Sequence, residues 1–207
     1  MCVAEFVSIA KDVVVGIAAL VGAVVAVLGL GTWKRQIKGQ SDYDLARRLL
    51  VTVFKYRDAV DGVRHPAMWA DEMPLPPADE SERMSREQSR FYGVSRAYQS
   101  RWEKVQVERA SLYADTLVAE ALWGDELKRL FKDLYSLEHE LLACIRLYLD
   151  AINPDIPDAT KDATAEIRKK RRDIMYDDLS EDGDEYRKQF RSKVEAVEKY
   201  LKSKLGH

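Results

Sequence analysis

The chain has 207 residues, 46% of them hydrophobic and 33% charged, and a formal net charge of −2. This near neutrality gives no overall electrostatic preference for nucleic acid or for an acidic partner, so nucleic acid is disfavoured as a ligand. The two cysteines, Cys2 and Cys144, are too few for a disulfide framework or a zinc cluster. The 33% of charged residues and only 6 prolines favour long helices with solvated faces over a compact α/β enzyme.

The first predicted element is a membrane anchor, residues 1–38. Val13 to Trp33 contains no charged residue, and Lys34, Arg35 and Lys38 follow it. A helix of about 21 residues is about 31 Å long, enough to cross the hydrocarbon core of a bilayer. The region before it is not basic and the apolar run is longer than that of a signal peptide. We therefore expect an uncleaved span over about residues 13–33, with the lipid bilayer as a partner.

The charges beside the span predict its direction. Lys11 is the only basic side chain before the span, whereas Lys34, Arg35 and Lys38 come directly after it. Because positive charge marks the cytoplasmic side, we expect the N-terminus outside and the rest of the chain in the cytoplasm, at the inner (plasma) membrane. The same three cations are expected to face anionic lipid.

Small residues recur on one side of the span. Ala18, Gly22 and Ala26 are spaced by four, which would let two helices approach closely and form a homo-oligomer. Alanine and glycine are also common in membrane helices, so composition alone is the other explanation.

The remainder, residues 39–207, is predicted to be a cytoplasmic helical domain. Gly39-Gln40 interrupts the helical pattern, and a capping box at 41–44 predicts a new helix there. Four prolines then make 64–84 a long loop. Apolar residues in this loop predict either a lid over the helices or a segment that docks a partner protein, with Trp69, Pro74 and Pro77 as its candidate residues.

Four further helices follow the loop. Spacings of three and four predict helices over about 85–122, 125–152, 161–172 and 185–205. The first two should form an antiparallel hairpin because only a short turn at Gly124 joins them. The predicted fold is all-α: one N-terminal transmembrane helix, then an elongated antiparallel bundle of about four helices.

A basic run is the strongest charge feature of this domain. It consists of Arg168, Lys169, Lys170, Arg171 and Arg172. One interpretation is a solvated helix balanced by the acidic residues at 177–184, and the other is an anion or lipid patch. Lipid is preferred to nucleic acid because no aromatic residue is interleaved to stack on bases.

No catalytic motif is apparent. His139 lies between Glu138 and Glu140, and adjacent helical residues point about 100° apart, so these three cannot converge on one metal ion. Neither a phosphate-binding loop nor a nucleophile elbow occurs. We expect a protein that is not an enzyme and that has no cofactor or metal.

Three segments carry a resemblance to a known group. The run WKRQIKGQSDYDLARRLLVTVFKYRDAVDGVRHP, with ALWGDELK and EAVEKYLKSKL, resembles an uncharacterised family of bacterial single-span membrane proteins with a cytoplasmic helical domain. The resemblance implies a bacterial inner-membrane location, and it transfers no activity or site residue.

These observations favour a membrane-anchored, non-enzymatic interaction or scaffold protein. Its partners would be a second copy of itself or an unidentified cytoplasmic protein. One alternative is an effector that perturbs the membrane when its span oligomerises. A weaker alternative is a membrane-tethered binder of nucleic acid or anionic lipid.

Overall fold

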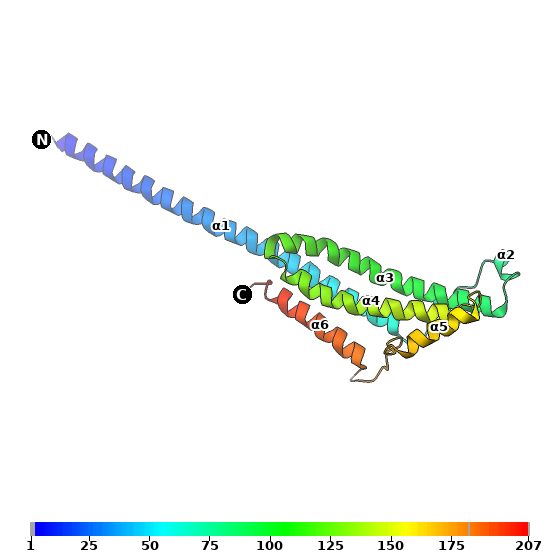
Figure 1. Ribbon diagram of the computed structural model, residues 1–207. Coiled ribbons are helices and arrows are strands. Elements are labelled where there is room, and N and C mark those ends of the chain that lie inside the picture. Colours follow the sequence, from blue (N-terminus) through cyan, green and yellow to red (C-terminus); the bar gives the residue numbers. More distant parts are fainter. Residues whose placement is uncertain (1–2, 182, 207) are drawn as a thin grey trace. The chain divides into compact units, whose positions relative to one another are not determined.

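The computed structural model describes residues 3–181 and 183–206, and side chains from Gly16 onward except those of residues 18, 19, 27 and 32. Within these residues the chain is all-α, as predicted, and has no strand. Figure 1 shows the elements, which are α1 (Val3–Arg64), the short 3₁₀ helix η1 (Ala70–Glu72), α2 (Ala78–Ser81), α3 (Arg86–Trp123), α4 (Glu126–Ile152), α5 (Asp158–Lys169) and α6 (Glu185–Lys202).

The chain forms two units. The first extends to Asp44 and the second comprises Leu45 to Leu205, so the boundary lies within α1. The predicted interruption at Gly39-Gln40 is wrong, because α1 continues through both residues. A single glycine inside a helix costs only about 1 kcal/mol, which is too little to end it. The predicted capping box at 41–44 starts no helix, because these residues lie inside α1. The Asp44 carboxylate accepts a 3.2 Å hydrogen bond from the side chain of Gln40, one turn earlier.

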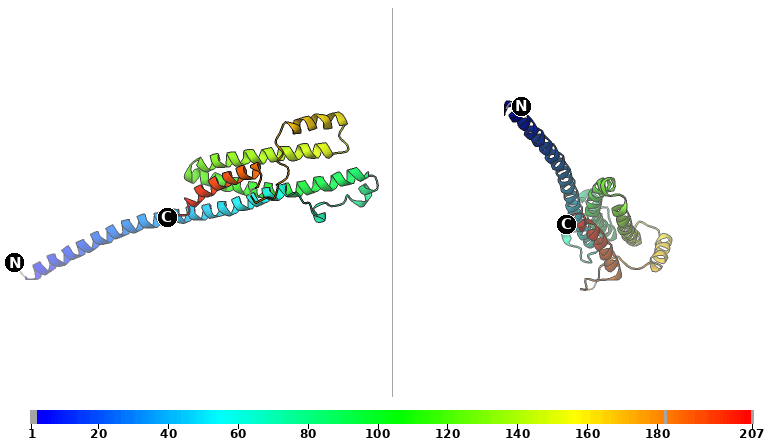
Figure 2. Two further views of the ribbon diagram at one scale, coloured as in Figure 1. Left: turned by 90° about the horizontal axis from the view of Figure 1, so that it is seen from below. Right: turned by 90° about the vertical axis from the view of Figure 1, so that its left-hand side faces the viewer.

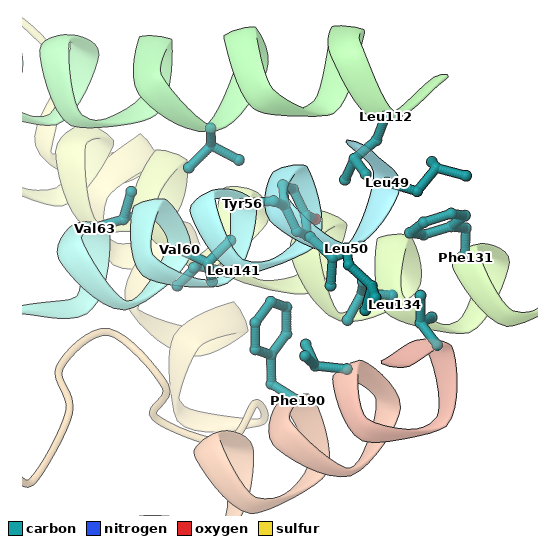
Figure 3. Packing of buried hydrophobic residues seen from close by; sticks show 14 of the residues in the cluster. Leu49, Leu50, Tyr56, Val60, Val63, Leu112, Phe131, Leu134, Leu141 and Phe190 are labelled. Atoms are coloured by element: carbon teal, nitrogen blue, oxygen red, sulfur yellow. The ribbon is translucent and has the colours of Figure 1, made fainter. Parts of the chain in front are cut away.

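The core of the second unit draws on four helices. Tyr56 and Val60 of α1, Leu141 of α4 and Phe190 of α6 belong to one hydrophobic cluster (Figure 3). The fourth helix is α3, whose residues at intervals of seven are buried: Tyr98, Val105, Leu112 and Ala119. Because the buried apolar residues of each helix recur at helical spacing, each helix has one apolar face. Burial of these faces against one another accounts for the packing of the four helices.

Helices α3 and α4 form the predicted antiparallel hairpin (Figures 1 and 2). The start of α3 is capped as predicted: the amide of Gln88 donates to the Ser85 hydroxyl, and the amide of Ser85 donates to the side chain of Gln88. Gly124 ends α3 with a φ of 82°, a conformation that favours glycine. Residues at the ends of α3 therefore determine where this helix begins and ends.

Helix α5 differs from its prediction. It covers Asp158–Lys169, beginning and ending three residues before the predicted bounds of 161–172. Pro157 supplies the start, since proline has no amide to donate and fixes a φ of −59° there. Helix α5 lies against α4 (Figure 2), and the chain then continues without regular structure to α6.

One buried arginine holds that irregular segment. Arg64 is 2% exposed at the end of α1, and its Nε donates to the carbonyl of Ile174 at 2.8 Å. Its Nη2 donates to the carbonyl of Tyr176 and to the carboxylate of Asp184. The guanidinium also lies 4.5 Å from the ring centre of Tyr186. Arg64 therefore connects α1 to the segment that precedes α6.

Candidate functional site

The first unit contains the apolar segment. By length and composition, one helix in the described part of the chain could cross a membrane, and it is α1. Its described large apolar side chains before Lys34 are exposed: Ile17, Leu20, Val21, Val24, Val25, Leu28, Leu30 and Trp33. Of the predicted contact face, Gly22 and Ala26 are exposed, and the side chain of Ala18 lies outside the described residues. A Cβ placed on Gly22 would meet nothing within 4 Å in this chain.

The predicted lipid-facing cations, Lys34, Arg35 and Lys38, are exposed as well. They follow the apolar segment on the same continuous helix. Arg35 makes one local contact, in which its Nε donates to the carbonyl of Gly31 at 3.4 Å. This arrangement suits interaction with the phosphates of lipid headgroups.

In the second unit, the proline-containing loop is held by Arg101 of α3. Arg101 is 5% exposed and donates to the carbonyls of His65 and Ala67 at 2.8 and 2.6 Å. It also forms a bidentate pair with Glu72, at 2.9 and 2.6 Å. These bonds lower the pKa of the Glu72 carboxyl to about 2, so it is ionised at neutral pH. The loop is therefore docked by a buried charge as well as by apolar contacts.

The three predicted partner residues of the loop are all exposed. Trp69 is 66% exposed, although Glu72 accepts a 3.1 Å hydrogen bond from its amide. Pro74 and Pro77 are exposed too. The prolines that punctuate the loop do not all face solvent, since Pro76 is buried. The loop thus combines a packed inner side with an exposed outer side.

The basic run lines a pocket between α4 and α5. The cavity has a volume of about 330 Å³, and its walls include Arg168, Lys169, Arg171 and Arg172. Glu140 and Asp173 add carboxylates, while Cys144, Leu147, Ala165 and Ile174 add mostly apolar surface. We call this cavity the α4–α5 pocket. The expectation that all five cations share one helix is wrong, because α5 ends at Lys169.

The cations of this pocket are not equivalent. Arg172 forms a bidentate pair with Glu140, at 2.7 and 2.6 Å, and donates to Gln189 at 2.9 Å. Lys169 pairs with Glu166 at 2.8 Å. Arg168 and Arg171 form no ion pair with a described residue, and Lys170 does not line the cavity. Of the acidic residues expected to balance the run, Asp177 and Asp184 pair with Arg187 and Arg64 instead, and Asp182 lies outside the described residues.

Two titratable groups of the α4–α5 pocket have shifted pKa values. The bond with Arg172 lowers the pKa of the Glu140 carboxyl, so this group is ionised. Burial raises the pKa of the Cys144 thiol, which keeps it neutral and makes it a poor nucleophile. The pocket therefore offers charge and a partly apolar wall, without an activated nucleophile.

A second cavity lies between α3 and α4. This α3–α4 groove has a volume of about 740 Å³, with Phe131 and Tyr135 on its wall beside Arg109. Behind it Glu138 is 1% exposed and accepts a 2.8 Å hydrogen bond from Arg109. His139 is on the wall too, and no group of three metal-ligating side chains is present among the residues described.

Comparison of the chain with protein-family models, curated proteins and solved structures yields no match. The family resemblance of the sequence therefore stays a prediction.

Proposed function

We propose that the chain is a single-pass protein of a bacterial inner membrane that holds a helical domain at the cytoplasmic face and acts there by binding another protein. The domain would be an elongated antiparallel bundle built mainly on α1, α3, α4 and α6. Its role would be that of an interaction or scaffold protein, without catalysis.

The observation that carries this proposal is the exposed apolar segment of α1. Leaving large aliphatic side chains in water costs about 25 cal/mol per Å² of apolar surface, whereas a lipid environment removes that cost. The segment is uncharged from Val13 to Trp33 and has three cations directly after it, the arrangement expected of a span with its C-terminal side in the cytoplasm.

The surface best suited to a protein partner is the outer face of α3. Large apolar side chains are exposed on its second half: Val107, Tyr113, Leu117, Val118 and Leu122. Tyr113 and Leu117 also line the α3–α4 groove, so this face continues to the edge of the groove. An apolar, weakly charged face on a rigid helix is typical of an interface. We therefore place partner binding on the second half of α3, and refer to these five residues as the α3 outer face.

Location and direction can be tested with single cysteines. In spheroplasts, a membrane-impermeant maleimide should label Cys2 of a Cys144→Ser variant. A chain with Cys2→Ser, Cys144→Ser and Ser203→Cys should be labelled only after lysis, because Ser203 is exposed in the second unit. Labelling of both sites only after lysis would contradict the outside N-terminus, and extraction of the protein by alkaline carbonate would contradict the span.

Partner binding can be tested with a photo-crosslinking amino acid in native membranes. Placed at Val118, it should give a discrete crosslinked product that mass spectrometry can identify. The control places it at Arg146, an exposed position of α4 outside the α3 outer face. Monomer alone at both positions, or the same products from both, would count against a specific interface on α3.

A further inference from the structure

We propose that the α4–α5 pocket binds a phosphomonoester dianion, carried either by a soluble metabolite or by a lipid headgroup. This goes beyond the proposed anchoring role, and it does not depend on the α3 outer face or on any protein partner. The two sources share the same terminal phosphate, so the pocket chemistry is the same for both.

The first support is the positive charge of the pocket wall. Arg172 and Lys169 each have a carboxylate partner, at 2.6 and 2.8 Å. Arg168 and Arg171 have none among the described residues, although both line the same cavity. The residues that line the cavity comprise four cations and the carboxylates of Glu140 and Asp173, so their formal charge of +2 matches the two negative charges of a phosphomonoester. Guanidinium groups bind phosphate oxygens in bidentate fashion.

The second support is that two cations of the wall, Arg168 and Arg172, are held by neighbouring side chains before any ligand arrives. Arg172 is held by Glu140 and Gln189, and its guanidinium lies 5.5 Å from the ring centre of Tyr186. Arg168 lies 5.8 Å from the ring centre of Tyr148. A cation already held by neighbours loses less conformational freedom when a ligand binds, which raises affinity.

The third support is size. A cavity of about 330 Å³ is at the small end of ligand pockets, and it exceeds the space that a bare phosphate ion needs. The apolar part of the wall, Leu147 and Ala165, can contact the organic group attached to the phosphate. The pocket therefore fits a small phosphorylated molecule or headgroup better than an inorganic ion.

The cations could instead have a purely structural role at the end of α5, and this explanation predicts a different effect of substitutions. Cations in the last turn of a helix stabilise its negative C-terminal end, and Arg168 and Lys169 occupy that turn of α5. Such a role needs no ligand and does not distinguish Arg171 from Lys170. Binding that depends on Arg171 and not on Lys170 separates the two.

The position of the pocket within the second unit leaves both sources of phosphate open. Its wall includes Ile174, whose carbonyl accepts from Arg64 at the end of α1. Along α1, Arg64 is about 29 Å from Leu45, where the second unit begins, at about 1.5 Å per residue. The test therefore uses a soluble and a membrane-bound form of one headgroup.

The experiment uses the full chain in nanodiscs of phosphatidylcholine, with Cys2→Ser so that Cys144 is the only thiol. Glycerol 3-phosphate is the soluble probe, measured by calorimetric titration. Phosphatidic acid, added to the nanodisc or supplied in vesicles, is the lipid probe. The rate at which a small neutral maleimide modifies Cys144, on the pocket wall, reports occupancy for both probes.

We expect glycerol 3-phosphate, phosphatidic acid or both to slow the modification of Cys144, and the probe that does so identifies the source. Arg171→Gln should weaken binding at least about tenfold, as loss of one charge-assisted hydrogen bond implies. Lys170→Gln removes the same charge from the neighbouring residue and should leave binding within about twofold, since an exposed charge outside the pocket contributes little.

Two results would overturn the proposal. One is that neither probe protects Cys144 or gives a heat of binding at millimolar concentration. The other is that Lys170→Gln and Arg171→Gln weaken binding equally, which would mean attraction to the general positive charge. Near-ultraviolet circular dichroism of each variant checks that the second unit stays folded. Because membrane location is measured separately by maleimide accessibility in spheroplasts, failure here leaves the proposed anchoring intact.

Discussion

The hydroxyl of Tyr56 donates a 2.6 Å hydrogen bond to Glu138 in the middle of the core. Tyr56 is fully buried and Glu138 is 1% exposed, so a carboxylate lies among apolar side chains. Arg109 donates to the other oxygen of the carboxylate at 2.8 Å and compensates its charge. Burial and the neighbouring carboxylate raise the pKa of Tyr56 far above its usual range, which keeps its hydroxyl protonated as a donor.

Removing this hydroxyl should destabilise the second unit. Tyr56→Phe leaves one oxygen of Glu138 without its buried donor, at a cost of about 1–3 kcal/mol in the free energy of unfolding. Urea denaturation followed by tryptophan fluorescence measures the change. Tyr113→Phe is the matched control, because Tyr113 is 62% exposed and its loss should be neutral. Equal midpoints for the two variants would show that the buried bond contributes nothing.

Arg101→Lys should release the proline-containing loop from α3. Lysine keeps the charge but cannot donate to Glu72 in bidentate geometry while also reaching the carbonyls of His65 and Ala67. We expect trypsin to cleave after Arg83, just beyond the loop prolines, several-fold faster than in the unmodified chain, because a released loop is open to proteolysis. Arg90→Lys, an exposed change on the same helix, should leave the cleavage rate unchanged.

Acid should weaken the same contact. The pKa of Glu72 is about 2 in the folded chain against a usual 4.5, so the folded state binds fewer protons. Its contribution to stability is therefore complete above pH 4.5 and is lost as the pH falls from there to 2. Urea midpoints between pH 6 and 2.5 should fall less steeply for Glu72→Gln, and parallel curves for the two proteins would exclude this role.

Gly22→Ile should reduce self-association if the predicted span face is used. A Cβ at this position meets nothing within 4 Å in its own chain, so a loss of dimer would report on contact with another helix. Crosslinking in membranes measures the dimer fraction. Gly31→Ile is the control, because nine residues at 100° each place Gly31 about 180° away on the helix. Dimer fractions that respond equally to the two changes would argue against this face.

The sequence predicted the interior of the second unit well where burial follows helical spacing. The apolar residues that recur at spacings of three and four along α4 and α6 are buried, including Phe131, Leu134 and Phe190. Hydrophobic periodicity depends only on neighbours within the same helix, so it can be read without knowing the partner. The span segment and its direction remain predictions that the experiments above address.

Charged residues in the interior could not be predicted in this way. Arg101 interrupts the apolar seam of α3, and its role becomes apparent only when the loop carbonyls are close to it. A glutamate within a helix is ordinarily expected on the solvated face, but the core surrounds Glu138. Tyr56 and Arg109, distant in sequence, supply its hydrogen bonds. Such pairs are long-range, and spacing along one helix carries no information about them.

The contact between α1 and α6 also affects folding during synthesis, because the two helices lie far apart in the sequence. Asp61 forms an ion pair with Arg191 at 2.5 Å, and these two residues are 130 positions apart in the sequence. The ring of Tyr56 also contacts that of Phe190. At about 10 residues per second, a ribosome needs on the order of 13 s between these two points. Throughout that interval the apolar side of α1 has no α6 to cover it. A nascent chain that stalls before residue 186 therefore exposes the apolar side of α1. A chaperone that recognises apolar helices would be expected to bind it.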